Sequence, residues 1–96
     1  QFKTNKNMKK NYIVIREFSF NKNSGFKVQS LPHLFTTEKR ALEFVEEFKT
    51  KLVGANVISQ KSMSDEFGNT WDKVILIETG FLTYYRVKIQ GTIANI

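Results

Sequence analysis

The 96-residue chain contains no cysteine, which excludes disulfide bonds, thiolate nucleophiles and cysteine-ligated zinc sites. Because small extracellular domains often depend on disulfides for stability, the absence of cysteine favours a cytoplasmic location. A chain of this length has room for a single domain with one hydrophobic core. Nine Phe, three Tyr and one Trp supply large side chains for that core.

Long hydrophobic segments are also missing. The longest uninterrupted apolar runs have four residues each, YIVI at 12–15 and VILI at 74–77. A membrane-spanning helix needs ~20 apolar residues, and the hydrophobic part of a signal peptide needs ~7–15. The sequence therefore predicts no membrane partner.

Residues that carry out catalysis are scarce. The only histidine, His33, follows the only proline, Pro32, in an expected connector, with no neighbour to orient it as a base. Asp65, Glu66 and Asp72 flank an expected turn and lack the spacing of a calcium loop. The glycines of the turns lack the strand–loop–helix context of a phosphate-binding loop. We therefore expect a non-catalytic protein without a metal or a small-molecule cofactor.

Alternating apolar residues predict strands on both sides of one helical segment. Polar turn residues at 21–25 favour a hairpin after the first strand, and Pro32 ends the second because it cannot donate to a sheet ladder. Residues 91–96 are expected to form a short tail. The predicted strands are 11–20, 26–31, 56–63, 71–79 and 81–90.

One helix is predicted after the second strand. Thr36 or Thr37 can cap it, Glu38 suits the positive end of the helix dipole, and Gly54 ends it near residue 53. Its apolar stripe consists of Ala41, Phe44, Val45, Phe48 and Leu52. The sequence thus predicts an α+β fold, order β-β-α-β-β-β, in which one helix packs on a face of an antiparallel sheet of about five strands.

The start of the chain differs from the rest in composition. Residues 1–10 are expected to form a flexible leader, partly foreign to the natural protein because MKKNYIVI at Met8 looks like a natural start, and residues 11–96 to form the domain. The net charge of +6 arises in residues 1–29, which carry seven Lys or Arg and one Glu, whereas the remainder carries eight residues of each sign. Loss of a foreign leader would weaken the case for a polyanionic partner.

Nucleic-acid binding by the sheet is the first functional hypothesis. Alternation in the last predicted strand places Tyr84, Arg86 and Lys88 on one face, where an aromatic ring can stack on bases and cations can contact phosphates. The alternate residues of the same strand are expected to face the helix, and they are Tyr85, Val87 and Ile89. The first hairpin would extend the binding surface, if both strands present the same face, with Tyr12, Arg16, Lys22 and Lys27. No RNP-like, KH or helix-turn-helix motif is present, and such residues also occur on ordinary solvent-facing strands.

A protein partner or self-association is the alternative. One helix of about 17 residues covers only part of one sheet face, so another surface can bind a partner or a second copy. On this hypothesis the chain is an interaction module or inhibitor of the type encoded by phages and mobile elements. The apolar candidates for such contacts, each of which also suits core packing, are Leu82, Tyr84, Trp71, Phe67 and the PHLF segment at 32–35.

Overall fold

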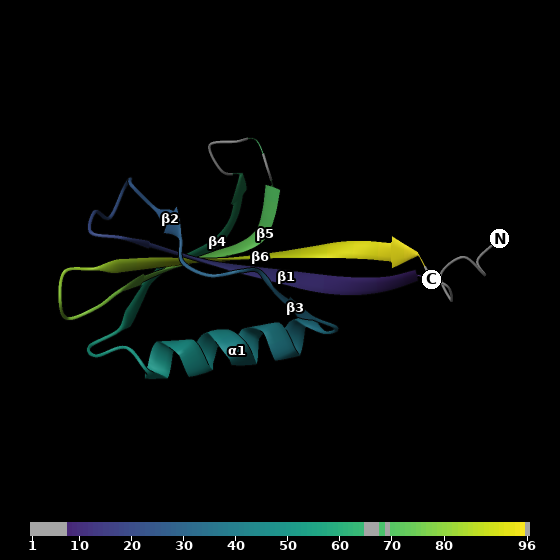
Figure 1. The fold of residues 1–96 in the computed structure, drawn as a ribbon, viewed down its shortest axis with the longest axis horizontal. Coiled ribbons are helices and arrows are strands. Elements are labelled where there is room, and N and C mark those ends of the chain that lie inside the picture. Colours follow the sequence, from purple (N-terminus) through teal and green to yellow (C-terminus); the bar gives the residue numbers. More distant parts are fainter. Residues whose placement is uncertain (1–7, 65–67, 69, 96) are drawn as a thin grey trace.

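A computed structural model describes residues 8–64, 68 and 70–95 and shows one helix lying along one face of a β-sheet (Figure 1). The elements in chain order are β1 (Met8–Ser19), β2 (Lys27–Val28), β3 (His33–Phe35), α1 (Glu38–Thr50), β4 (Asn56–Ser64), β5 (Thr70–Glu78) and β6 (Tyr84–Asn95). The predicted α+β class, with an antiparallel sheet and one helix packed on it, is confirmed.

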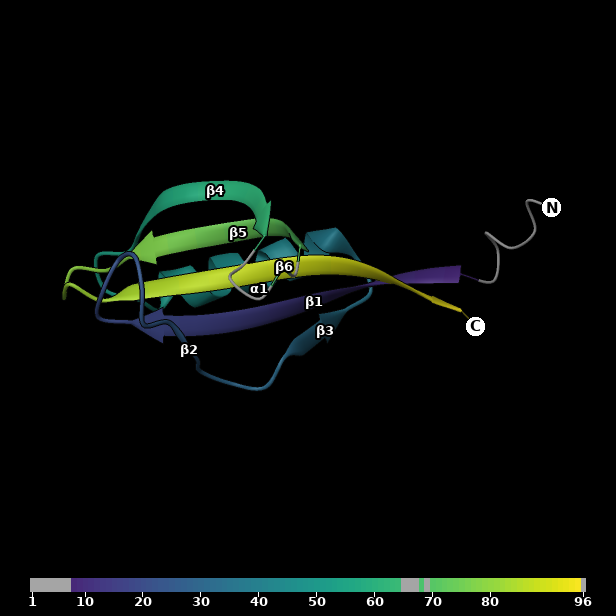
Figure 2. The same cartoon turned by 90° about the horizontal axis from the view of Figure 1, so that it is seen from above.

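The sheet has six strands, and all of its pairings are antiparallel. Its order is β2-β1-β6-β5-β4, and β3 pairs with β1 on the same edge as β2 (Figure 2). The first and last strands are therefore neighbours at the centre, where Met8 pairs with Asn95 and Ser19 pairs with Tyr84. The chain crosses from one edge to the other through α1.

The segment after Pro32 is a short strand, whereas the sequence predicted a connector. β3 pairs with residues 12–14 of β1, and the predicted second strand is reduced to β2, which pairs with residues 17 and 18. β1 is long enough to accept both short strands along one edge. Pro32 lies between the two pairings, where its missing N–H group is not needed by the sheet.

Both central strands are longer than predicted at the end that carries the termini. β1 begins at Met8 instead of Asn11, and β6 continues to Asn95 through the expected tail. Each strand extends the other, because residues 8–11 of β1 pair with residues 92–95 of β6. Residues 1–7 of the expected leader lie outside the described residues.

The helix has the predicted Thr37 cap and buries Ala41, Val45 and Phe48 of its predicted stripe, but it ends at Thr50 instead of near residue 53, so that Leu52 lies beyond it. Thr37 Oγ1 accepts a hydrogen bond from the Arg40 N–H group at 3.1 Å, and Gly54, at φ 67°, lies shortly after the helix end. The core between α1 and the sheet contains Val14, Ala41, Val45, Phe48, Ile75, Ile77, Val87 and Ile89. Within the described part of the chain, no helix has the length and apolar character needed to cross a bilayer.

Candidate functional site

The side of the sheet opposite α1, here called the helix-free face, carries the even-numbered residues of β6. Glu17 pairs with Arg86, and Ile15 pairs with Lys88. Paired residues in an antiparallel ladder point to the same side, so odd-numbered β1 residues share this face with even-numbered β6 residues. Tyr84, Arg86 and Lys88 thus share one face, as their spacing predicted.

Tyr12 and Arg16 lie on the other side of the sheet. The Arg16 guanidinium carbon is 4.7 Å from the ring centroid of Phe48 on α1, and Arg16 Nη2 donates to Ser30 Oγ at 3.1 Å. Tyr12 packs against the hydrophobic core. The sequence predicted Tyr12 and Arg16 on the same face as Arg86. In the structure odd-numbered β1 residues pair with even-numbered β6 residues, so the even-numbered Tyr12 and Arg16 face α1 instead.

An ion triad, formed by Glu17, Arg86 and Lys88, lies on the helix-free face. Arg86 Nε donates to Glu17 Oε1 at 2.5 Å, and Lys88 Nζ lies 3.2 Å from Glu17 Oε2. Glu17 is 6% exposed and Lys88 is 5% exposed. One carboxylate therefore neutralises one of two cationic charges, and the triad keeps a formal charge of +1. The sequence reasoning did not identify Glu17 as part of this surface.

Aromatic rings cover both cations of the triad. Lys88 Nζ is 4.6 Å from the ring centroid of Trp71, which is itself buried, and the Arg86 guanidinium carbon is 4.5 Å from that of Phe26. Both distances are in the range of cation–π attraction. Lys88 is therefore a buried member of a packed polar cluster. Trp71, which the sequence offered either as a partner contact or as a packing residue, packs inside the protein.

Tyr84 has a separate partner at the start of β6. Its hydroxyl donates to Glu78 Oε2 at 3.2 Å, and these two residues pair across β5 and β6. Partial burial raises the pKa of Tyr84 above its ordinary value of 10.0, and the hydrogen bond to Glu78 and the negative charge of that carboxylate raise it further. Tyr84 thus lies beside a carboxylate, in contrast to the cationic surroundings expected for a phosphate contact.

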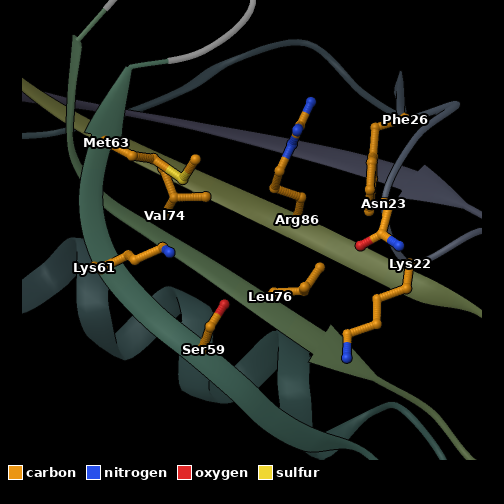
Figure 3. A pocket seen from close by; sticks show the side chains of 9 residues that line it. All are labelled: Lys22, Asn23, Phe26, Ser59, Lys61, Met63, Val74, Leu76 and Arg86. Atoms are coloured by element: carbon orange, nitrogen blue, oxygen red, sulfur yellow. The ribbon is translucent and has the colours of Figure 1, made fainter.

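A cavity of about 250 Å³, here called the trough, opens on the helix-free face (Figure 3). β5 and β6 form its floor, β4 forms one wall, and the loop of residues 20–26 forms the other. Its lining consists of Lys22, Asn23, Phe26, Ser59, Lys61, Met63, Val74, Leu76 and Arg86. These residues come from four separate segments, so the tertiary fold creates the trough.

Local hydrogen bonds shape the loop wall. Ser19 Oγ donates to the Ser24 carbonyl at 2.6 Å and accepts from the Asn21 N–H group at 2.9 Å, and Asn21 Oδ1 accepts from the Asn23 N–H group at 2.8 Å. Gly25 adopts φ 76°, which suits glycine. These bonds hold the polypeptide between Ser19 and Gly25 in one turn, which positions the loop side chains beside β6.

The β4 wall is shaped by irregular pairing with β5. The register shifts between Val57 and Ser59 and again between Lys61 and Met63. Such bulges bend a strand and increase its twist, consistent with the way β4 curls over the sheet in Figures 1 and 2. Val57 pairs with the core residue Ile77, whereas Ser59, after the first shift, pairs with Leu76. This shift turns the odd-numbered residues that follow to the helix-free face, where Ser59, Lys61 and Met63 line the trough.

The trough combines positive charge with an apolar floor. Lys22, Lys61 and Arg86 approach it from three segments, and within residues 8–64, 68 and 70–95 no Asp or Glu lines it. Phe26 and Met63 add apolar surface to that of β5. This chemistry suits an anionic ligand that also has an aromatic or apolar part.

Two of the seven residues predicted from the sequence line this site. These are Lys22 and Arg86, whereas Lys88 belongs to the ion triad outside the lining. Lys27 pairs with Phe18, whose ring contacts Tyr85 on the α1 side of the sheet. The sequence reasoning missed Phe26 and the β4 residues. The alternation of β4 is only moderate, and the shift between Val57 and Ser59 interrupts it.

Two of the residues considered for catalysis or metal binding, His33 and Asp72, are described, and each has its own contacts. The His33 ring contacts that of Phe44 in a tilted arrangement, with 4.5 Å between centroids, and its buried Nε2 has no hydrogen-bond partner among the described residues. Asp72 Oδ2 accepts from the Gly91 N–H group at 2.6 Å. Asp65, Glu66 and Phe67 lie outside the described residues. In the part of the chain that the structure describes, no cluster of three His, Cys, Asp or Glu residues could hold a metal ion.

The size of the trough limits the ligands that it can hold. Pockets that enclose small molecules usually measure ~300–1,000 Å³. At about 250 Å³ the trough is smaller, and it suits one unit of a longer chain better than a whole enclosed cofactor.

No family model, no curated protein and no solved structure matches this chain.

Proposed function

We propose that this chain is a non-catalytic binding protein that holds single-stranded nucleic acid on its helix-free face. The trough receives one nucleotide, and the cations around it contact neighbouring phosphates. The observation that carries the proposal is the convergence of Lys22, Lys61 and Arg86 around an aromatic and apolar cavity, with no carboxylate among the described residues that line it.

The charge distribution supports a polyanionic ligand. Lys22 and Lys61 are both exposed at opposite walls of the trough, so a phosphate backbone that runs between the walls meets a cation on each side. Arg86 lies between them on the floor and is partly neutralised by Glu17. Contacts of this kind release condensed counterions, which makes affinity strongly dependent on salt.

The shape and the aromatic content of the trough favour a single strand over a duplex. Sequence-tolerant binding of single strands combines a cationic groove with aromatic side chains on which bases stack. Phe26 is half-buried at the wall, and the Arg86 guanidinium lies over its ring. An unpaired base can insert into the small cavity, whereas the bases of a duplex stay stacked and paired.

A protein partner is the second candidate, and the open edge of β4 favours it. β4 pairs with β5 on one side, and no described strand pairs with its other edge. Val57, Ile58 and Met63 are exposed along it. An exposed edge can accept a strand from another chain, although the extra β4 residue between Val57 and Ser59 makes such pairing less regular.

Fluorescence anisotropy tests the nucleic-acid proposal. Labelled single-stranded DNA, single-stranded RNA and duplex DNA are titrated at two salt concentrations with the full chain and with a chain beginning at Met8. We expect single strands to bind more tightly than duplex, with both chains. The Lys22→Gln, Lys61→Gln double variant should lower the magnitude of the salt slope for single strands by about 1.4.

The matched control is the Lys39→Gln, Arg40→Gln double variant, which removes the same charge from exposed positions on α1. It should retain most of the affinity. Equal losses in the two double variants would mean that net charge alone drives binding, and binding that ignores salt would also contradict the proposal. If no nucleic acid binds, the proposal is wrong and the edge of β4 becomes the leading surface.

A further inference from the structure

Three loops gather at the end of the molecule opposite the termini, here called the loop end. They are residues 20–26 after β1, residues 51–55 after α1 and residues 79–83 between β5 and β6 (Figures 1 and 2). The Gly80 N–H group donates to the Val53 carbonyl at 3.0 Å, which joins the second and third loops. The first loop begins beside the third, because Ser19 pairs with Tyr84.

Large apolar side chains project from each of these loops. Phe20 is 78% exposed, Val53 is 67%, Phe81 is 70% and Leu82 is 74%. Single exposed apolar residues are ordinary on protein surfaces, whereas a group of four at one end indicates a surface that contacts something apolar. None of the four belongs to the hydrophobic core.

The turn that carries Phe81 and Leu82 is held by its own hydrogen bonds. The Thr79 N–H group donates to the Thr83 carbonyl at 3.0 Å, and the Phe81 N–H group donates to Thr79 Oγ1 at 3.1 Å. Leu82 adopts φ 57°, the left-handed region that favours Gly or Asn. Since its side chain is largely exposed, packing does not compensate for this strain. The strained residue instead presents an apolar side chain to the surroundings.

The charge and the exposed apolar area of the loop end argue against a second copy of the chain as its partner. The three loops contain Lys22 and Lys51 and no Asp or Glu. A second copy docked end to end would bring the loop lysines of both copies together, and the loops themselves contain no carboxylate to pair with them. The four side chains expose on the order of a few hundred Å², which is below the about 800 Å² per partner of a stable protein interface.

We propose that the loop end docks on an anionic lipid surface. Phe20, Phe81 and Leu82 insert at the boundary between headgroups and acyl chains, while Lys22 and Lys51 contact lipid phosphates. This contact lies on a membrane without spanning it. It departs from the sequence-based prediction of no membrane partner, which rested on the missing long apolar segments. The proposal does not depend on nucleic-acid binding, because its apolar anchors Phe20, Phe81 and Leu82 lie outside the trough lining; Lys22 is common to both surfaces.

Flotation with vesicles tests the proposal directly. The full chain is mixed with vesicles of phosphatidylcholine alone and with vesicles that also contain phosphatidylserine, and bound protein is measured after centrifugation. We expect binding to the anionic vesicles and little binding to the neutral ones. The Phe81→Ser, Leu82→Asn double variant should bind the anionic vesicles about tenfold more weakly or less.

The substitution Leu82→Asn separates binding from folding. Asn tolerates the left-handed conformation, so this single variant should have an unfolding temperature at or above that of the wild type while it binds vesicles more weakly. Lys39→Gln on α1 is the charge control and should bind almost as well as the wild type. A Phe81→Trp variant should show fluorescence quenching by brominated lipids beyond that of the wild type, which reports insertion.

Three outcomes would overturn the proposal. One is the absence of binding to either kind of vesicle. Another is equal binding by the wild type and by the Phe81→Ser, Leu82→Asn variant, which would leave only a non-specific attraction of a basic protein. The third is vesicle binding without any additional quenching of the tryptophan at position 81.

Discussion

Glu17 of β1 and Arg86 of β6 lie directly opposite each other at the centre of the sheet, and Arg86 Nε donates to Glu17 Oε1 at 2.5 Å. The same carboxylate lies 3.2 Å from Lys88 Nζ. Two cations that the sequence assigned to a phosphate-binding face therefore have an intramolecular partner. Arg86 thus belongs both to the ion triad at the sheet centre and to the floor of the trough.

The first prediction concerns Glu17. The substitution Glu17→Gln removes the carboxylate that contacts both the buried Lys88 ammonium and the Arg86 guanidinium, so the free energy of unfolding should fall by about 3–5 kcal/mol. Urea unfolding followed by circular dichroism measures it. Glu46→Gln, at an exposed helix position that pairs with Lys49, should change it by less than about 1 kcal/mol. Similar small losses in both variants would show that the triad contributes little.

The second prediction concerns Phe26 and rests on the proposed function. Phe26→Leu keeps an apolar side chain at the trough wall but removes the aromatic face, so affinity for single-stranded nucleic acid should fall about tenfold. The control is Phe20→Leu, the same change in the same loop but outside the trough lining, which should leave the affinity unchanged. Anisotropy titrations compare the two. An equal effect, or none in either, would argue against base stacking in the trough.

The third prediction concerns Gly54, where the loop after α1 meets the β5–β6 turn. Gly54 has φ 67°, and an added Cβ would lie 3.0 Å from Gly80 N and 3.1 Å from Gly80 Cα, both backbone atoms. Gly54→Ala should therefore destabilise the fold by about 2 kcal/mol or more. Gly68→Ala, at φ 84° in open space, should cost only the backbone strain of about 1 kcal/mol. Equal losses in urea unfolding would mean that the close approach to Gly80 has no energetic consequence.

The fourth prediction concerns the pH dependence of stability at Tyr84. Its pKa is raised above 10.0 in the folded protein, so the unfolded chain releases the phenolic proton first as the pH rises. This contribution to stability is fully present below the unfolded pKa and is lost as the pH rises through the folded pKa. Tyr84→Phe cannot ionise, so its unfolding free energy should decline less across pH 10.0 than that of the wild type. Parallel declines would show that Tyr84 ionises alike in both states.

Local patterns were sufficient for the elements whose signals lie within a few residues. The Thr37 cap and the burial of Ala41, Val45 and Phe48 follow from helical spacing and from the hydrogen-bonding needs of a helix terminus. The alternation of β6 likewise separates Val87 and Ile89 from Arg86 and Lys88, because successive side chains of a strand point to opposite faces.

The candidate site could be predicted only in part, because it depends on pairing between distant segments. Lys22 and Arg86 were identified as cations on strands or turns, but Lys61 reaches the trough through the bulged pairing of β4 with β5. Phe26 joins it through the turn fixed by Ser19. Neither contact leaves a periodic signal in the sequence, since each is formed between residues whose separation the pattern does not constrain.

The amino-acid sequence by itself determined the α+β class, the helix with its cap and the two faces of each central strand, since these depend on propensity and periodicity over short stretches. Tertiary structure alone decided the register of β1 against β6. The antiparallel ladder set Glu17 opposite Arg86 and turned Arg16 toward Phe48, because a shift of one residue would have moved every β1 side chain to the other face. That register placed the charges of the helix-free face, and the curl of β4 completed the trough beside them.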